Sequence, residues 1–456
     1  MTQALPKDVP QTLRRWKRYP AYKDSGIDWL SEIPEDWRVM LIKRVASVRY
    51  GLGQPPPESI NGTPLIRATN IKSGSISEES MLYVDPDEVP ESRDAILSPG
   101  EIIVVRSGAY TGDSAIIPIA YAGAIAGYDM VLTPKKGFSP FFAWQILSAE
   151  VRELQFGFHR LRAAQPHLNA EELKETIVVV PPLPEQQAIA SFLDRETAKI
   201  DALIAKKERL IELLQEKRTA IISHAVTKGL DPTVPMKNSG IECLGKIPRH
   251  WNIIKLGRLC NVTKLTGFEY TKFWKTIPEG DIIALRGLNI KNNRLILDDV
   301  ERISSELSNQ LFRSKLFAGD IVFPCTGTIG NGALIEEDNK FHINQNIAKI
   351  TPGSKLNSKF TLYVLISQNM QYQISYLNAS DFQPVLLIGT IRDIKLQIPP
   401  KIEQDSIVDW LDRKTFQIDA LINKTHTSIE QLKEYRTALI SAAVTGKIDV
   451  RNEVAS

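Results

Sequence analysis

A long stretch of this chain occurs twice, and this repeat limits the possible fold more than any other feature. The first copy runs from Pro181 to Gly229, and the second begins at Pro399, 218 positions later and with no gap. Twelve of the twenty residues from Glu185 to Ile204 are identical to their counterparts. Two unrelated core helices would not match over this whole length, so we interpret the similarity as an internal repeat.

Each copy is predicted to form one long helix. Prolines at positions 181, 182 and 184 keep the preceding chain extended, Glu185 places negative charge in the first turn, and Gly229 or Gly446 closes the helix. Apolar residues recur on a seven-residue grid, which is typical of a coiled-coil seam. The predicted seam comprises Leu193, Ile200, Leu203, Leu210, Leu214, Ile221, Leu411, Ile418, Leu421, Leu432, Tyr435 and Leu439.

Such a helix needs a partner. At about 1.5 Å per residue it spans roughly 60 Å and is too one-sided to be stable alone in water. We therefore expect the two copies to pair with each other. Polar Thr425 and Ser428 fall on the predicted seam of the second copy.

Length and composition indicate an ordinary globular protein. The chain has 456 residues, 43% of them hydrophobic, which suffices for two or three domains. A net charge of +3 neither requires nor excludes a nucleic-acid partner. The three cysteines lack CxxC spacing and predict a reducing compartment with no structural disulfide or zinc site. No apolar run approaches the roughly 20 residues of a membrane span, so we expect a cytoplasmic protein without a membrane partner.

A second repeat precedes each long helix. Lys23–Trp37 returns as Lys237–Trp251, with eight of fifteen residues identical. The chain thus consists of two tandem halves, each with a leading segment, a variable domain and a long helix. Residues 1–20 end in a run of basic and aromatic side chains that could either contact phosphates or form a solvated tail.

The variable domains are predicted to be mainly β. Short β-branched runs such as Ile102–Val105 and Ile177–Val180 alternate with glycine, proline and asparagine turns. Phe141–Leu154 and Phe360–Gln373 each predict one amphipathic helix. The predicted domains are an N-terminal tail (1–20), a first variable domain (21–180), a central helix (181–230), a second variable domain (231–398), a C-terminal helix (399–449) and a tail (450–456).

The tandem pattern resembles the specificity subunit of type I restriction-modification enzymes. The residues that carry the resemblance are SGIxxLxxIPxxW, a variable domain and EQxxIxxxLDxxTxxIDxLI, twice over. The resemblance implies an α+β fold in which two target-recognition domains are separated by two long antiparallel helices forming a coiled coil with a pseudo-two-fold internal repeat. It also implies that each domain reads one half of a split, asymmetric DNA sequence.

The resemblance further implies which partners act with this chain. They are double-stranded DNA, two methyltransferase subunits docked on the helices, and restriction or translocase subunits. The chain itself has no glycine-rich cofactor loop, no Asn/Asp-Pro-Pro-aromatic motif, no GxxxxGK[ST] loop and no HExxH pair. We therefore expect a non-catalytic subunit without a cofactor or metal, with S-adenosylmethionine, ATP and magnesium bound by its partners.

Residues that the two halves share are candidates for DNA positioning rather than base reading, because base readers should differ between domains. Arg67 and Lys72 are candidates for phosphate contacts or for ordinary solvated surface, and Asn70 could instead satisfy its own turn. The full positioning set is Arg67, Asn70, Lys72, Arg286, Asn289, Lys291, Gln165 and Gln383. The glycines of RSGAYTG, from Arg106 to Gly112, and of CTGTIG, from Cys325 to Gly330, are interpreted as tight turns.

Residues that differ between the halves are the candidates for base reading. Arginine suits guanine and asparagine suits adenine in the major groove. The candidates are Arg106 and Tyr128, which stand opposite Cys325 and Asn346, together with His159, Arg160, Arg162, Asn346, Asn378 and Ser380.

Two other functions remain open on the sequence alone. One is a specificity subunit that serves a fused nuclease-methyltransferase. The other is a non-catalytic coiled-coil scaffold whose paired domains bind proteins. If the main interpretation is right, adding a helical turn to both long helices should lengthen the spacer between the half-sites.

Overall fold

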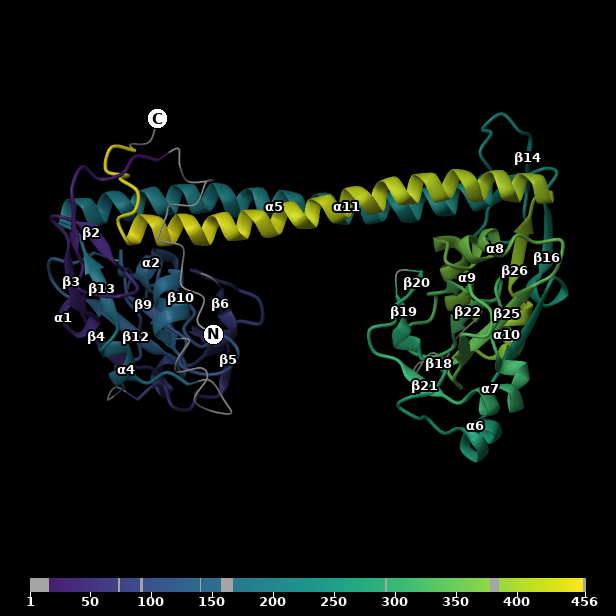
Figure 1. Ribbon diagram of the computed structural model, residues 1–456, viewed down its shortest axis with the longest axis horizontal. Coiled ribbons are helices and arrows are strands. Elements are labelled where there is room, and N and C mark those ends of the chain that lie inside the picture. Colours follow the sequence, from purple (N-terminus) through teal and green to yellow (C-terminus); the bar gives the residue numbers. More distant parts are fainter. Residues whose placement is uncertain are drawn as a thin grey trace. The chain divides into compact units, whose positions relative to one another are not determined.

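The computed structural model describes residues 16–72, 74–90, 93–139, 141–156, 167–291, 293–377 and 385–453. The chain divides into two compact units, of which unit 1 comprises Met1–Lys207 and His426–Ser456 and unit 2 comprises Glu208–Thr425. The long helices α5 (Leu183–Lys228) and α11 (Lys401–Val444) each contribute one half to either unit. Each unit therefore contains the start of one long helix and the end of the other (Figure 1).

Unit 1 is built on two small sheets. The strand order of the larger sheet is β10-β9-β12-β4, all antiparallel, and that of the smaller is β11-β5-β8, with β11 parallel to β5. Their bounds are β4 (Ala46–Tyr50), β9 (Ile102–Val104), β10 (Ser114–Ile116) and β12 (Met130–Pro134), then β5 (Glu58–Ile66), β8 (Leu82–Val84) and β11 (Ile125–Ala126). Three antiparallel pairs accompany them: β1 (Tyr22–Asp24) with β2 (Glu32–Pro34), β3 (Arg38–Leu41) with β13 (Ile177–Val180), and β6 (Ile71–Lys72) with β7 (Ser75–Ile76). The short helices are α1 (Ile42–Val45), α2 (Phe142–Ile146) and α4 (Ala170–Lys174).

Unit 2 repeats this topology strand for strand. Its sheets have the orders β17-β25-β22-β23 and β21-β18-β24. Their bounds are β17 (Cys260–Lys264), β25 (Ile347–Pro352), β22 (Ile321–Pro324) and β23 (Ala333–Leu334), then β21 (Glu301–Ile303), β18 (Ile282–Leu285) and β24 (Phe341–Ile343). The matching pairs are β14 (Met236–Asn238) with β15 (Lys246–Pro248), β16 (Asn252–Lys255) with β26 (Lys395–Ile398), and β19 (Ile290–Lys291) with β20 (Arg294–Leu295). The short helices are α6 (Gly267–Phe273), α7 (Ser305–Gln310), α8 (Ser358–Leu365), α9 (Gln368–Leu377) and α10 (Ile388–Asp393).

The long helices run antiparallel within each unit. In unit 1 the Arg436 guanidinium of α11 pairs with Asp201 of α5, at 2.9 Å from Nε to Oδ1. In unit 2 the Arg218 guanidinium of α5 pairs with Asp419 of α11, at 3.2 Å from Nε to Oδ1. The two pairs are related by the 218-residue repeat, and their residue numbers add to the same value, as an antiparallel pairing requires.

The predicted seam is half right. Leu193, Ile200, Leu214, Leu411, Ile418 and Leu439 are buried, and Ile221, Leu432 and Tyr435 are half-buried. Leu203, Leu210 and Leu421 are instead 43%, 40% and 44% exposed. The second row of the seam lies four residues after the first, at positions such as Thr197, Ile211 and Ile429, whereas the sequence analysis placed it three residues after.

Polar residues also occur on the true seam. Thr425 is buried, and its hydroxyl donates to the Leu421 carbonyl of its own helix at 2.8 Å. The prediction that Thr425 lies on the seam is therefore confirmed, whereas Ser428 is only half-buried and lies beside it. The hydroxyl of Thr425 is satisfied locally, so it costs the interface little.

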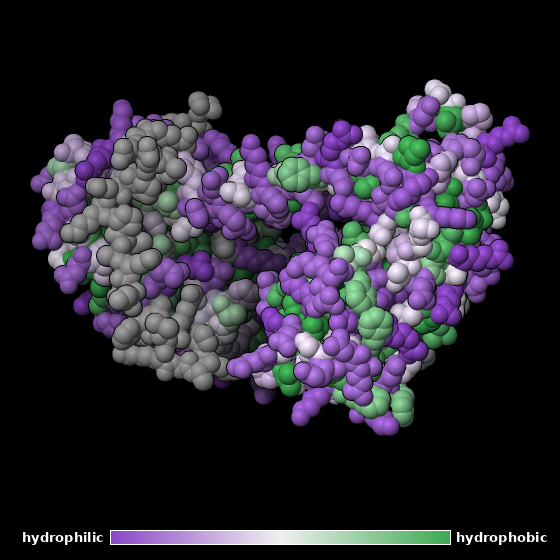
Figure 2. Space-filling model, turned by 45° about the vertical axis from the view of Figure 1, so that its right-hand side comes forward, coloured by the Kyte–Doolittle hydropathy of each residue, from purple (hydrophilic) through white to green (hydrophobic). Residues whose placement is uncertain are grey.

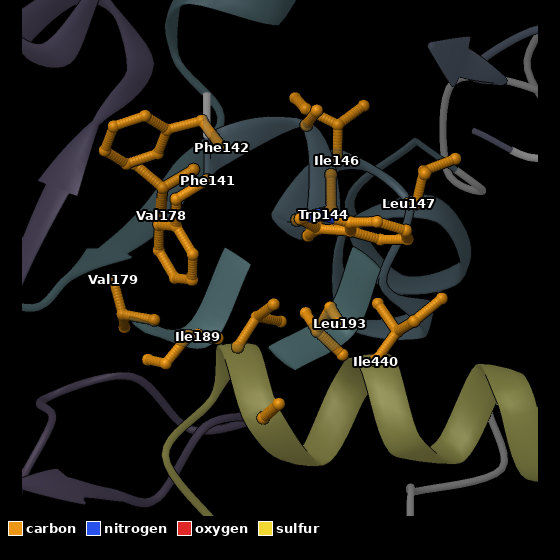
Figure 3. Packing of buried hydrophobic residues seen from close by; sticks show 14 of the residues in the cluster. Phe141, Phe142, Trp144, Ile146, Leu147, Val178, Val179, Ile189, Leu193 and Ile440 are labelled. Atoms are coloured by element: carbon orange, nitrogen blue, oxygen red, sulfur yellow. The ribbon is translucent and has the colours of Figure 1, made fainter. Parts of the chain in front are cut away.

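The core of unit 1 joins the sheet to both long helices. Leu193 of α5 and Ile440 of α11 lie against Trp144 of α2 and against Leu147, which directly follows α2 (Figure 3). Trp144 is anchored further by a hydrogen bond from its Nε1 to Asp194 of α5 at 3.1 Å. This packing buries the apolar side chains at the start of α5 and at the end of α11. Neither helix alone could bury them.

The predicted amphipathic helices are present but broken at the same place. Ser148 and Ser367, both buried, each donate through Oγ to the carbonyl three residues earlier at 2.7 Å. This bond competes with continuation of the helix, so the next backbone amide has no partner within its own helix. That amide donates instead to a serine hydroxyl at the end of a long helix. The acceptor is Ser441 of α11 in unit 1, at 3.0 Å, and Ser223 of α5 in unit 2, at 2.9 Å.

The repeated tryptophan of each leading segment holds the start of a long helix. Trp37 donates from Nε1 to Oε1 of Glu185 at 3.1 Å, and Trp251 donates in the same way to Glu403 at 3.1 Å. Both tryptophans are fully buried. Gly446 lies against Trp37 with a φ of +76°, and a Cβ there would clash with Pro34, so the turn after α11 requires glycine.

Of the two interpretations of residues 1–20, the solvated tail does not hold for the last residues. Tyr19 is buried, donates to Glu185 at 2.6 Å and lies under the Arg451 guanidinium. Trp16 packs edge-on against Phe192. The backbone of Lys17 forms an antiparallel β-bridge with that of Asp449 in the C-terminal segment. Ile448 and Val450 are buried as well. Residues 1–15 lie outside the described part of the chain.

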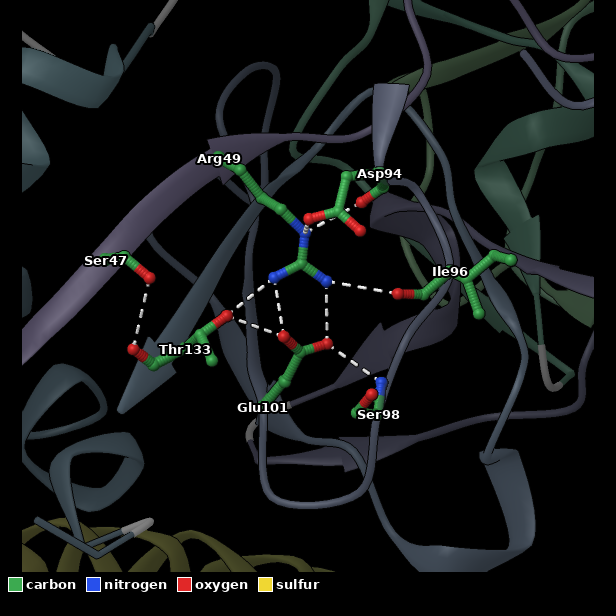
Figure 4. Close-up of polar contacts among 7 residues, drawn as sticks. All are labelled: Ser47, Arg49, Asp94, Ile96, Ser98, Glu101 and Thr133. Carbon is green, nitrogen blue, oxygen red and sulfur yellow. Dashed lines mark hydrogen bonds and ion pairs between the residues drawn. The ribbon is translucent and has the colours of Figure 1, made fainter. Parts of the chain in front are cut away.

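A charged network fixes a loop of unit 1 to its larger sheet (Figure 4). Arg49 of β4 forms a bidentate pair with Glu101, at 2.5 and 2.7 Å, and Thr133 of β12 donates to the same carboxylate at 2.6 Å. Burial acts to raise the pKa of Glu101, but the bonds from Arg49, Thr133 and Ser98 hold it below its ordinary value. In unit 2, Asp320 occupies the corresponding position and accepts from Thr351 at 2.5 Å.

Candidate nucleic-acid interface

The shared motif around Arg67 forms a hairpin in which asparagine has a structural role. Asn70 is fully buried, and its amide donates to the carbonyls of Ser77 at 3.2 Å and Glu79 at 3.1 Å. Its Oδ1 accepts from the Arg67 backbone amide at 3.3 Å. The buried Asn70 side chain therefore satisfies its own turn, which was the alternative reading of this residue, and a role in DNA positioning stays a prediction.

The equivalent residues of unit 2 make similar contacts. Asn289 is fully buried and donates to the carbonyls of Ile296 at 3.0 Å and Asp299 at 2.8 Å. Arg286 pairs with Asp299 at 2.9 Å and with Glu301 at 3.4 Å, so carboxylates already neutralise its charge. Asn289 and Arg286 thus both make contacts within the fold.

The basic residues at the tips of these hairpins stay at the surface. Arg67 donates to the Ser80 carbonyl at 2.8 Å and is half-buried. Lys72 forms an exposed pair with Glu79 at 2.5 Å, which raises the pKa of the lysine, and Lys291 is exposed at the equivalent place. An exposed ion pair of this kind contributes little to stability, so a phosphate could replace Glu79 at small cost. Arg67, Lys72 and Lys291 therefore remain candidates for phosphate contacts.

The glycine-rich segments form tight turns, as predicted. Gly108 and Gly112 have φ values of +90° and +83°, and Gly327 and Gly330 have +72° and +96°. In unit 1 the Thr111 hydroxyl closes the turn by donating to the Gly108 carbonyl at 2.7 Å. Residues 108–110 project from the surface directly after Arg106.

Arg106 and Tyr128, predicted from the contrast between the two halves, lie together. The Arg106 guanidinium lies 4.2 Å from the ring centroid of Tyr128 and 4.7 Å from that of Tyr50, at the end of β4. His167 Nε2 is 3.4 Å from Arg106 Nη2. The Arg106 carbonyl accepts from the Leu168 amide at 2.7 Å, which fixes the backbone of this cluster.

The corresponding positions of unit 2 carry different side chains on the same backbone. Cys325 replaces Arg106, and its carbonyl accepts from Leu386 at 2.8 Å, as the Arg106 carbonyl does from Leu168. Lys264, at the end of β17, stands where Tyr50 stands, and Asn346 and Val385 replace Tyr128 and His167. Burial raises the pKa of the Cys325 thiol, while the nearby charge of Lys264 acts to lower it.

A buried acid lies under the arginine cluster. Asp129 accepts from the Arg106 backbone amide at 3.2 Å and is 2% exposed. Burial raises the pKa of Asp129 to about 6, and the hydrogen bonds from Arg106 and Ala68 and the Arg106 charge act in the opposite direction. The Arg106 charge therefore favours the ionised form of Asp129, and Asp129 in turn holds the Arg106 backbone.

Seven predicted site residues lie outside the described part of the chain. They are His159, Arg160, Arg162, Gln165, Asn378, Ser380 and Gln383. Sequence reasoning missed Tyr50 and His167 in unit 1 and Lys264 in unit 2. The first two are far from Arg106 in sequence, so only the strand register of β4 and the bridge from Ser107 to His167 bring them to it.

A cavity of about 550 Å³ in unit 2 offers no unpaired cation among its described lining residues. Its cations are all paired with carboxylates: Arg218 and Arg294 with Asp419, and Lys359 with Asp412. The Tyr363 hydroxyl donates to Asp412 at 2.7 Å, in the place where Trp144 contacts Asp194 in unit 1. These contacts tie the domain to α11 rather than offering charge to a ligand.

The long helices expose apolar side chains outside the buried seam. In unit 2 they include Leu210 and Leu213 of α5 and Phe416 and Leu421 of α11, and in unit 1 they include Leu203 of α5. On the face seen in Figure 2, hydrophobic residues appear as separate spots in a mainly hydrophilic surface. Among the described residues, no helix is long and apolar enough to cross a membrane.

Comparisons with known proteins agree with the repeated architecture. Residues 34–213 and 248–432 each match the sequence model of the type I restriction modification DNA specificity domain. The MjaVIII specificity subunit of Methanocaldococcus jannaschii is 23% identical, over 92% of this chain and 95% of its own. The EcoBI specificity subunit of Escherichia coli is 22% identical, over 93% and 89%.

A solved structure shares the fold. It is described as showing complex assembly and conformational transition of the type I R-M system, and it has a TM-score of 0.63 at 16% identity. The match covers 90% of this chain and 98% of that one. On the strength of both matched regions, the chain belongs to the family of type I restriction-modification DNA specificity subunits.

Proposed function

We propose that this subunit reads a bipartite, asymmetric DNA target, with one unit for each half-site. The observation that carries the proposal is the contrast at four matched positions: Tyr50, Arg106, Tyr128 and His167 in unit 1 against Lys264, Cys325, Asn346 and Val385 in unit 2. The strand order around them is the same in both units. A common backbone with different side chains at one place suits two readers of different sequences.

The helix pair, in this proposal, separates the two readers and docks the methyltransferase subunits. The seam accounts for the buried face of each helix, and exposed leucines such as Leu210 and Leu213 remain for a partner. Exposed apolar residues on a helix face suit packing against helices of another protein.

The proposed subunit recognises DNA and leaves the chemistry to its partners. They would include two methyltransferase subunits that bind S-adenosylmethionine, and restriction or translocase subunits that bind ATP and magnesium. This chain would hold no cofactor of its own.

Base-modification sequencing tests the proposal. Genomic DNA is compared from cells that express the methyltransferase with and without this gene. We expect a split methylated motif that is present only with the gene. An unchanged pattern of modified bases, with the methyltransferase expressed, would contradict the proposed function.

A further inference from the structure

The Arg106 side chain is held against two aromatic rings. Its guanidinium carbon lies over the ring of Tyr128, 4.2 Å from the centroid, and over the ring of Tyr50, 4.7 Å from the centroid. Cation–π contacts of this kind restrain a side chain that would otherwise be mobile. Restraint before binding lowers the entropy lost on binding.

The cluster is anchored on all sides by the fold. The Tyr50 hydroxyl accepts from the Ala170 amide at 2.9 Å, at the start of α4. The Arg106 backbone is held by Asp129 at 3.2 Å and by Leu168 at 2.7 Å. Tyr128 is 47% exposed, so the cluster reaches the surface.

Among the described residues, no carboxylate side chain forms an ion pair with the Arg106 guanidinium. Its backbone amide, rather than its guanidinium, contacts the carboxylate of Asp129. The polar neighbour of the guanidinium among the described residues is His167, whose Nε2 lies 3.4 Å from Arg106 Nη2. This differs from Arg49 and Arg286, whose guanidinium groups pair with carboxylates.

We infer that Arg106, positioned by Tyr50 and Tyr128, reads a guanine in the half-site recognised by unit 1. A planar fork with two parallel N–H donors matches the O6 and N7 acceptors that guanine presents in the major groove. Unit 2 has a buried cysteine at this position and cannot make the same contact. The inference rests on the proposed function and names the base that one of its sites selects.

A phosphate contact is the competing role for the same arginine. A phosphate contact would weaken binding to all sequences alike, whereas a guanine contact would relax specificity at one position. The two roles therefore predict different methylation patterns for the same variant.

The first experiment is base-modification sequencing of cells that express the methyltransferase with Arg106→Gln, Arg106→Lys or the control Arg44→Gln. Arg44 is an exposed arginine of unit 1 outside the cluster. We expect both Arg106 variants to lose discrimination at one guanine, about 10- to 100-fold, with the other half-site unchanged. Arg44→Gln should preserve the motif.

The lysine variant distinguishes the fork from the charge. It keeps the positive charge and most of the stem, so a phosphate role would leave its activity close to that of the wild type. Arg106→Lys also tests the inference if Arg106→Gln fails to fold. Thermal unfolding of the purified protein would reveal such a failure.

The second experiment uses the reconstituted complex and duplexes with 7-deazaguanine at the identified position. This base lacks the N7 acceptor. We expect it to slow methylation by the wild type and to have no further effect on Arg106→Gln. A wild-type split motif that both variants preserve, or equal slowing on every sequence, would overturn the inference and leave the proposed function intact. The absence of any split motif in the wild type would instead contradict the proposed function.

Discussion

At the scale of single residues, the repeat conserves hydrogen bonds within the chain as well as sequence. Trp37 and Trp251 donate to Glu185 and Glu403 over the same 3.1 Å, although the two variable domains share little sequence. A buried carboxylate is costly without donors, so the tryptophan of the leading segment stabilises the start of each long helix. This explains why the leading segment is repeated together with the helix.

Trp37→Phe should destabilise unit 1 by about 1–3 kcal/mol, because it removes one donor to the buried Glu185 carboxylate while keeping an aromatic ring. Urea unfolding of the full-length protein measures the change. Trp29→Phe is the control, since Trp29 packs on the same core and its side chain makes no hydrogen bond to the described residues. Equal destabilisation by both substitutions would show that the hydrogen bond has no role.

Asp129 should make stability depend on pH in an unusual direction. Its pKa is about 6 in the folded protein against an ordinary 3.8, so the folded state holds the proton more tightly than the unfolded chain. The free energy of unfolding should therefore fall as the pH rises from about 4 to about 6, by up to about 3 kcal/mol from this group. Asp129→Asn should remove that component, as urea unfolding at pH 4 and pH 7 would show. Parallel pH profiles for variant and wild type would contradict it.

At the scale of elements, two symmetry-related ion pairs fix the register of the long helices. Arg436 with Asp201 and Arg218 with Asp419 flank the seam, and the arginine side chains are only 15% and 19% exposed. Ion pairs that flank a coiled-coil seam set the pairing and orientation of the helices. A slip of one helix along the other would separate both pairs.

Charge reversal at one pair tests this role. Asp201→Arg and Arg436→Asp should each destabilise the protein, and the double variant should recover part of the loss, with a coupling energy of about 1–2 kcal/mol. A double-mutant cycle by urea unfolding gives the value. The exposed pair Glu430 and Lys433, three residues apart on α11, is the control and should couple by only a few tenths of a kcal/mol. Equal coupling in both cycles would contradict a register role.

Sequence predicted the elements better than their faces. The prolines, glycines and the repeat placed both long helices within a few residues of their observed bounds. The predicted buried face was wrong in one of its two rows. Leu203, Leu210 and Leu421 fit a seven-residue repeat as well as the buried positions do, and only packing distinguishes the predicted row from the observed one. The same limit applies to the site: the contrast between halves found Arg106 and Tyr128, while Tyr50 and His167 reach them only through strand pairing.

At the scale of the whole molecule, substitution of exposed leucines tests docking separately from folding. Leu210→Glu together with Leu213→Glu should weaken association with the methyltransferase about tenfold or more, because charge replaces apolar contact area on the proposed docking face. Ile402→Glu, an exposed apolar residue near the start of α11, is the control. Co-purification and analytical ultracentrifugation measure the association. Retained binding by the double variant would move the docking face elsewhere.

The central claim is that the helix pair sets the distance between two DNA readers. A heptad inserted after Lys207 in α5 and another after Thr425 in α11 keep the seam continuous and lengthen each helix by roughly 10 Å. That length corresponds to about three base pairs. The most direct measurement is base-modification sequencing with this variant. The account predicts unchanged half-sites with a spacer longer by two or three base pairs, whereas a methylated motif with an unchanged spacer would contradict it.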